Sequence, residues 1–226
     1  MEQEAHIIRS KRKTLAMEIR PDGTLVVRAP LRLPQKEIAR FVQSHAAWVE
    51  RKRKEMAARP QPVRHAFLPG EAFRFLGQKC FLRYSGGKEL VALKGDVLVV
   101  PALPREQLRS KIIAWYRAQA RLVLKQRLDG WARKTGLCYS GLRITSAKTR
   151  WGSCTGKNVL SFPFFLVMAP PEVIDSVVVH ELCHTRFHNH SSQFWQLVHS
   201  VLPDYDARHR WLMDNGLQLR LEEAAQ

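Results

Sequence analysis

Apolar residues recur every three or four positions in two long stretches of the chain. The first stretch follows Pro34, and the second follows Pro104 and runs to about Lys134, just before Thr135-Gly136. A proline at the first helical position and a glycine just beyond the last are typical of helix ends. The pattern therefore predicts one helix from residue 34 to just before Pro60, and a longer helix from residue 104 to about 134.

The remaining pattern alternates between apolar and polar positions, as strands do. Residues 14–29 hold two alternating segments around Pro21-Asp22-Gly23, which predicts a hairpin. Residues 66–101 hold several short segments separated by glycines at hairpin intervals, which predicts an antiparallel meander. Residues 142–162 predict a further strand and then a strand pair around a turn at residues 155–158.

This order of elements indicates an α+β fold. We expect an N-terminal β-rich region with one helix over residues 1–101, followed by a mainly helical domain with a small edge sheet over residues 102–226. A chain of 226 residues is long enough for one large domain or two small ones, and its 45% hydrophobic content is ordinary for a globular protein.

The most specific chemical signal is His180-Glu181-Leu182-Cys183-His184, which follows three valines in a predicted helix that starts at Pro170-Pro171. Residues four apart lie on one face of a helix, so His180 and His184 can both direct an imidazole nitrogen at one Zn²⁺, at roughly 2.0–2.1 Å. Glu181 is turned about a quarter turn from that face and can reach the zinc-bound water as a general base. The pattern predicts one catalytic Zn²⁺ per chain; ordinary histidines on a half-buried helix are the alternative.

His190 is the candidate for the third protein ligand, because a catalytic zinc takes three protein ligands and leaves a fourth position open. We expect the helix to end near Phe187 or His188, Asn189 to close it in a left-handed turn, and one of the serines that follow to cap the next helix. The spacing to His190 is that of the metzincin zinc site, although Phe187 stands where metzincins carry a glycine. Other candidates for the third ligand are His188, Asp204, Asp206 and His209.

The chain has four scattered cysteines: Cys80, Cys138, Cys154 and Cys183. They form no C-x-x-C pair, so we expect reduced thiols, with Cys183 as a small buried packing residue. No apolar run approaches the roughly 20 residues of a membrane span, and the N-terminus lacks the apolar core of a secretory signal. We therefore expect a cytoplasmic protein with no membrane partner.

The net charge is +17, from 37 Lys and Arg residues against 20 Asp and Glu residues. Such an excess invites an anionic partner, such as nucleic acid, a nucleotide, polyphosphate or an acidic peptide. The alternative is a solvated surface, because many of the basic residues lie along the predicted helices. The charge therefore allows a nucleic-acid or nucleotide partner without requiring one.

Several separated motifs resemble those of the YgjP-like metallopeptidases. They are Ser10-Lys11-Arg12, Arg20-Pro21-Asp22-Gly23, Lys148-Thr149-Arg150-Trp151-Gly152-Ser153-Cys154, His180-Glu181-Leu182-Cys183-His184, Asn189-His190-Ser191 and Phe194-Trp195. The resemblance covers nearly the whole chain in the family's order. It implies a zincin-like catalytic domain behind a β-rich N-terminal region, with the three histidines as zinc ligands and Glu181 as the catalytic glutamate. A more distant similarity to SprT-like and WLM-type metalloproteases, which act on proteins attached to DNA, is a reason to consider DNA-linked substrates.

These features favour a zinc-dependent hydrolase, and specifically a metallopeptidase with a peptide or protein substrate. Such a substrate could lie along an exposed strand edge within residues 150–162. Arg150 in that segment could stabilise an oxyanion or bind a substrate carboxylate, or it could form a structural ion pair.

Two alternatives remain. The same site could hydrolyse nucleotides or other phosphoanhydrides, with the basic surface holding the phosphates. In the second alternative the chain is a basic nucleic-acid-associated protein whose zinc is structural and closed by a fourth protein ligand. The oligomeric state stays open. So does the group that orients each zinc histidine, which is usually a carboxylate or a carbonyl; the possible carboxylates are Asp175, Asp204, Asp206 and Asp214.

Overall fold

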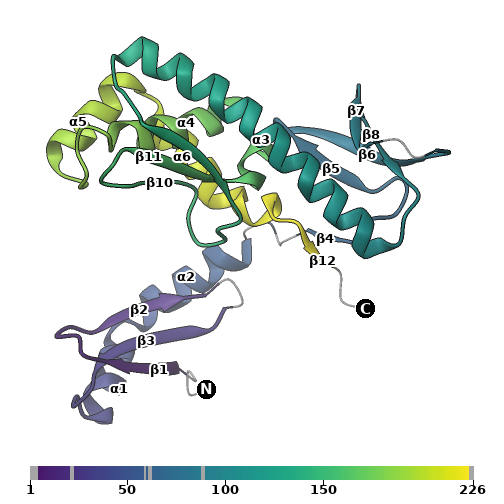
Figure 1. Ribbon diagram of the computed structural model, residues 1–226. Helices are drawn as coiled ribbons and strands as arrows, with labels where there is room; N and C mark the ends of the chain where they lie inside the picture. Colours follow the sequence, from purple (N-terminus) through teal and green to yellow (C-terminus); the bar gives the residue numbers. More distant parts are fainter. Residues whose placement is uncertain (1–4, 21–22, 59, 61–62, 88–89, 224–226) are drawn as a thin grey trace. The chain divides into compact units, whose positions relative to one another are not determined.

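The computed structural model describes residues 5–20, 23–58, 60, 63–87 and 90–223. They form two compact units, Met1–Pro60 and Gln61–Gln226 (Figure 1). The boundary expected between residues 101 and 102 lies inside the second unit. No helix in the described part of the chain is long and apolar enough to cross a membrane.

The first unit is a three-stranded mixed sheet packed against two helices. Its strands are β1 (Ala5–Ser10), β2 (Ala16–Ile19) and β3 (Leu25–Pro30), in the order β1-β3-β2. The predicted hairpin is confirmed, because β2 pairs with β3 antiparallel, while β1 pairs with β3 in parallel. Two residues of the predicted turn, Pro21 and Asp22, lie outside the described residues.

The single helix predicted after Pro34 is two helices, α1 (Gln35–Ser44) and α2 (Ala46–Ala58). His45 leaves the helical conformation between them, with φ −110° and ψ 16°. The Ser44 hydroxyl donates to the Phe41 carbonyl at 2.9 Å, and Nδ1 of His45 lies 2.9 Å from the same oxygen. These side chains compete with the backbone for that carbonyl, which explains the break.

The second unit begins with a small sheet whose strand pairing differs from the prediction. Its strands are β5 (Ala72–Phe75), β6 (Gln78–Ser85), β7 (Ala92–Lys94) and β8 (Val97–Pro101). Their order is β5-β6-β8-β7, and β6 pairs with β8 in parallel, so the predicted antiparallel meander is wrong. After the turn at Gly95 (φ 63°), β8 takes β7 on one edge, which leaves its other edge for β6.

The helices and the remaining strands complete the second unit. They are β4 (Arg64–His65), α3 (Arg105–Thr135), β9 (Gly141–Thr145), β10 (Ser153–Cys154), β11 (Val159–Pro163), η1 (Phe164–Met168), α4 (Pro171–Cys183), α5 (Ser192–Val201), α6 (Tyr205–Asn215), η2 (Gly216–Leu219) and β12 (Glu222–Glu223). The predicted end of α3 is confirmed, because Gly136 closes it with φ 70°. The segment that follows α6 forms η2 and the strand β12, which pairs with β4.

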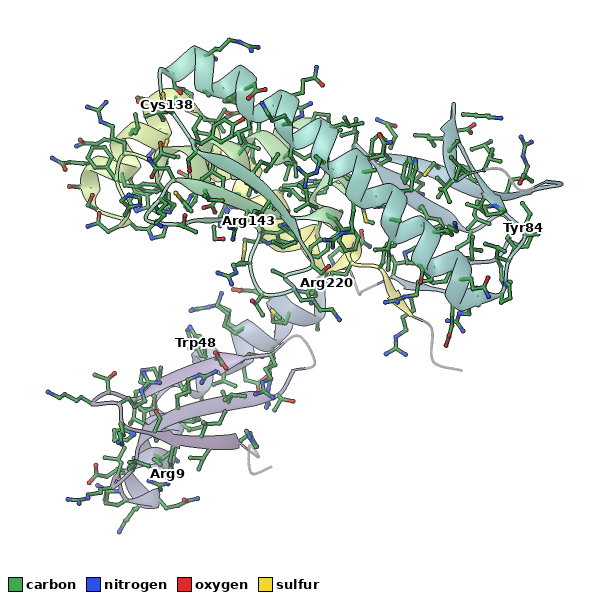
Figure 2. The ribbon with its side chains drawn as sticks, viewed as in Figure 1. Arg9, Trp48, Tyr84, Cys138, Arg143 and Arg220 are labelled. Atoms are coloured by element: carbon green, nitrogen blue, oxygen red, sulfur yellow. The ribbon has the colours of Figure 1, made fainter. Side chains whose placement is uncertain are left out.

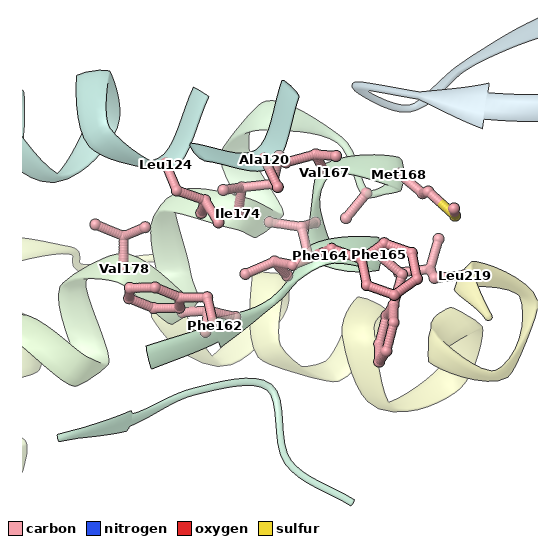
Figure 3. Close-up of a cluster of buried hydrophobic side chains, with 14 of the residues drawn as sticks. Ala120, Leu124, Phe162, Phe164, Phe165, Val167, Met168, Ile174, Val178 and Leu219 are labelled. Carbon is pink, nitrogen blue, oxygen red and sulfur yellow. The ribbon is translucent and has the colours of Figure 1, made fainter. Parts of the chain in front are cut away.

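A single buried core joins the four-stranded sheet to the helices. Ala120 and Leu124 of α3 face Ile174 and Val178 of α4, with Phe162 of β11 beside them (Figure 3). The same core contains side chains from the sheet, namely Phe73, Leu82, Leu98 and Val100. The α+β class is therefore confirmed, and the shared core is the reason that residues 61–101 belong to the second unit.

We expect a fragment of residues 102–226 to lack a cooperative thermal unfolding transition, because it would lose the sheet side chains that fill this core. A fragment of residues 61–226 keeps them and should unfold cooperatively. Far-ultraviolet circular dichroism on heating would compare the two. A cooperative transition at the same temperature in both fragments would contradict the shared core.

Candidate metal centre

The helix α4 carries the histidine motif at its C-terminal end. Pro171 occupies its first turn and Glu172 supplies an acidic residue there, and both features favour a helix start. The three valines before the motif are 6%, 0% and 1% exposed, so this turn of the helix is buried on most of its circumference. The helix is thus fixed by packing just before it reaches the histidines of the motif.

The helix ends earlier than predicted, at Cys183. His184 still has helical angles (φ −64°, ψ −17°), and its N–H donates to the His180 carbonyl at 3.3 Å, so the two imidazoles keep the one-turn spacing. Next comes a tight turn in which the Thr185 hydroxyl donates to the Leu182 carbonyl at 2.7 Å. That bond takes a carbonyl near the helix end and accounts for the early stop.

The path into His190 also differs from the expectation. Over the described part of the chain, neither Phe187 nor Asn189 has a positive φ, so the predicted left-handed turn at Asn189 is wrong. A glycine is not required at position 187 for the same reason. Ser191 does cap α5, as one of the two candidate serines, by accepting a hydrogen bond from the Phe194 N–H at 3.4 Å.

The three histidines meet at one point. Nε2 of His190 lies 3.2 Å from Nε2 of His184 and 3.1 Å from Nε2 of His180. Two ligands of a tetrahedral zinc, each about 2.05 Å from the ion, stand about 3.3 Å apart. The cluster therefore has the size of a metal site, and none of the other four candidate ligands belongs to it.

The outer ring nitrogens of His184 and His180 both have hydrogen-bond partners, and the partner of His184 fixes its tautomer. Nδ1 of His184 donates to the Phe187 carbonyl, 2.9 Å away, which leaves the lone pair on Nε2. Nδ1 of His180 lies 2.9 Å from the Tyr205 hydroxyl. Burial, together with the neighbouring histidines, lowers the pKa of His180 to about 3, so its ring is neutral near pH 7. Neutral imidazole is the form that binds metals.

Tyr205 is the residue that the sequence did not reveal. The partner expected for a ligating histidine was a carboxylate or a carbonyl, and a carbonyl serves His184. Of the candidate carboxylates, Asp175 pairs with Arg127 at 2.8 Å and Asp204 pairs with Arg208 at 2.8 Å. Tyr205 is the first residue of α6. No local sequence pattern predicts that the first residue of this helix contacts His180.

Glu181 is buried beside the histidines, with 6% of its surface exposed. Burial raises its pKa to about 8, against an opposing effect of the positive charge on Arg150. A methyl group placed on Gly152 would stand 2.4 Å from Cγ and 2.5 Å from Oε1 of Glu181. The backbone at Gly152 therefore lies directly against the glutamate, and only glycine fits there.

The loop that carries this glycine, residues 148–152, packs against the segment that follows α6. Trp151 packs so closely on Gly216 that an added methyl group there would stand 2.4 Å from its indole ring. The same indole meets Phe165 edge to face at 5.6 Å. Arg220, which is labelled in Figure 2, donates to the Lys148 carbonyl at 2.8 Å. The contacts of Trp151 with Gly216 and of Lys148 with Arg220 therefore fix this loop from both ends of the segment before Gly152.

Arg150 is exposed on this loop. It takes part in none of the ion pairs found among the described residues, so the structural ion pair considered above is not formed. Its charge acts on Glu181 through space. Next along the chain, β10 is the outer strand of the sheet β10-β11-β9 and packs beside α4, as expected for a strand pair near the site.

Comparisons with known proteins agree with this picture at the level of the family. The family described as YgjP-like, metallopeptidase domain, matches residues 13–215. No curated protein matches the chain. Two solved structures are similar: the metallopeptidase zymogen abylysin of Pyrococcus abyssi (TM-score 0.38, 19% identity, 45% of this chain and 99% of that one) and jannalysin of Methanocaldococcus jannaschii (TM-score 0.36, 16% identity, 40% and 93%). Similarity this low does not extend to activity.

Replacing Tyr205 with Phe should weaken metal binding about 10- to 100-fold, because the ring of His180 loses the hydroxyl that orients it. Competition with a chromophoric chelator would measure the affinity for zinc. Tyr139→Phe is the matched control, since the Tyr139 hydroxyl bonds Asp129 and does not contact the histidines. Equal affinity of Tyr205→Phe and the wild type would show that the hydroxyl does not support the site.

Proposed function

We propose that this chain, which belongs to the YgjP-like metallopeptidase family, is a zinc-dependent peptidase. The observation that carries the proposal is the meeting of three Nε2 atoms next to a buried glutamate. Three protein ligands leave one position for water and substrate, whereas structural zinc sites close with four. In the described part of the chain no fourth side chain joins the cluster, which favours the catalytic interpretation over a structural zinc.

His180, His184 and His190 would hold the zinc, and their donor set and spacing fit that ion. When bound, zinc polarises a substrate carbonyl and makes water acidic enough to attack near neutral pH. Glu181 would accept the proton of the attacking water at a carboxylate oxygen and pass it to the leaving amine. A carboxyl pKa raised towards neutral pH suits a group that takes up a proton in one step and releases it in the next.

The loop beside Glu181 and the strand β10 that follows it could position a peptide substrate. The outer edge of β10 could pair with an extended segment, which would lay the substrate alongside α4. Arg150 is exposed and its charge acts on Glu181 through space, so it could stabilise an oxyanion or bind a substrate carboxylate. The same charge would suit a phosphate, so hydrolysis of a nucleotide or another phosphoanhydride is the second candidate.

Glu181→Gln should reduce hydrolysis at least 10²-fold while zinc stays bound, because the amide cannot accept the proton and the three ligands are untouched. The test is a parallel screen of a peptide and denatured-protein library and of nucleoside triphosphates, with zinc content measured in both proteins. Glu172→Gln is the control, as an exposed glutamate on the same helix.

The three outcomes of this screen are distinct. Peptide cleavage lost in Glu181→Gln supports the peptidase, and release of phosphate or pyrophosphate lost in the same way would replace it with the second candidate. Hydrolysis that survives in Glu181→Gln would overturn the role of the glutamate in either reaction.

Gly152→Ala should lower kcat by a similar order without loss of zinc, because the new methyl group must displace the Glu181 side chain. Gly156→Ala is the matched control, since Gly156 sits in the neighbouring turn with nothing within 4 Å of the added carbon. Steady-state kinetics on the best substrate would compare them. Equal kcat values for the two variants would show that the contact with Glu181 does not position it.

A further inference from the structure

The outer face of the four-stranded sheet carries an exposed aromatic ring among positive charges. Side chains alternate along a strand, and directly paired residues share a face. The inner face holds Phe73, Leu82 and Leu98, which fill the core. The register then places the following residues on the outer face: Arg74 and Ala72 of β5, Lys79, Phe81 and Arg83 of β6, Val97 and Val99 of β8, and Lys94 and Ala92 of β7.

Phe81 stands at the centre of this face with 43% of its surface exposed. Its direct neighbours across the sheet are Ala72 and Val97, whose side chains are too small to cover a phenyl ring. Lys79 and Arg83 flank it two positions away along the same strand, and both are exposed. The five side chains Arg74, Lys79, Phe81, Arg83 and Lys94 are called the platform below.

Protection of a strand edge does not explain the exposed ring. Charges on an edge strand prevent pairing with other sheets, but Phe81 lies where β6 pairs with β5 on one side and with β8 on the other. A phenylalanine exposed there contributes nothing to the core on the other face. The sequence K-C-F-L-R therefore alternates between two surfaces, one apolar and packed, the other cationic and aromatic.

The platform also carries a local electrostatic cost. Arg74 and Lys79 are directly paired across β5 and β6, and like charges in that position destabilise a sheet. None of the hydrogen bonds and ion pairs found among the described residues engages the side chains of Arg74, Lys79 or Arg83. In the described part of residues 63–101 the acidic residues are Glu71, which bonds His65, and Asp96, in the turn before β8. An anion bound between the cations would relieve this repulsion.

We propose that the platform binds single-stranded nucleic acid, with a base stacked on Phe81 and the backbone phosphates held by the flanking cations. Aromatic side chains on a sheet face take unpaired bases in this way, while basic residues follow the backbone. A duplex keeps its bases stacked on one another and offers Phe81 nothing. An acidic peptide would satisfy the charges but leave the exposed ring without a partner.

Fluorescence anisotropy with the full chain tests this surface and needs neither metal nor hydrolysis. The probes are labelled thymidine and uridine oligonucleotides of about 12 nucleotides and a DNA duplex of the same length, at about 50 and 200 mM salt. We expect binding of the single strands that weakens with salt, and weaker binding of the duplex. The DNA and RNA probes show which sugar the platform prefers.

Phe81→Ala should weaken binding of the single strands about 5- to 150-fold, which is the loss expected for one stacked base. Phe81→Trp should retain it. Arg83→Gln should lower the steepness of the salt dependence by about 0.7, the value for one phosphate contact on a single strand. The controls lie on α3 and are Leu122→Ala, which removes a side chain that is 65% exposed, and Arg121→Gln, which removes an exposed charge.

Three results would overturn the proposal. They are the absence of single-strand binding at the lower salt concentration, equal binding by Phe81→Ala and the wild type, and equal affinity for the duplex with the same dependence on Phe81. Competition by polyglutamate as effective as that by the oligonucleotide would likewise reduce the surface to unspecific charge. Circular dichroism on Phe81→Ala and Phe81→Trp shows that the sheet is folded when these comparisons are made.

Discussion

The arrangement of the three histidines and Glu181 depends on the burial of α4 in the core. Burying each of its valine side chains contributes roughly 1.5–3 kcal/mol, and these contacts hold the helix against α3 and β11. The C-terminal turn of the same helix then carries groups that are costly without a ligand. Glu181 is buried, and Nε2 of His190 lies within 3.2 Å of Nε2 of both His180 and His184. Burial of the valine side chains offsets the free-energy cost of placing these polar groups together, and a bound cation would remove that cost.

The ligand helix was readable from sequence because its information is local. The spacing of His180 and His184 is that of one helical turn, and the valines before them match a buried helix face. The long helix α3 and the β2–β3 hairpin were predictable for the same reason, since their ends carry their own proline, glycine and turn signals. His190 could be named from spacing, although the turn that brings it in was misjudged.

The failures concern contacts between segments far apart in the chain. Tyr205 reaches His180, and Gly216 receives the indole of Trp151, through packing that no local pattern encodes. The parallel pairing of β6 with β8 was missed because glycine-rich turns look alike whether the next strand joins its neighbour or the strand beyond. The boundary expected after residue 101 was likewise placed where the sequence pattern changes from strands to a helix. The buried core contains side chains from both sides of that position.

Crystals of the zinc-loaded protein, with anomalous diffraction recorded at the zinc edge, would test the central claim most directly. The account predicts one strong peak bonded to Nε2 of His180, His184 and His190 at roughly 2.0–2.1 Å, with a water in the fourth position. A fourth protein ligand on the ion, or a peak bonded elsewhere, would contradict a catalytic metal centre on this helix.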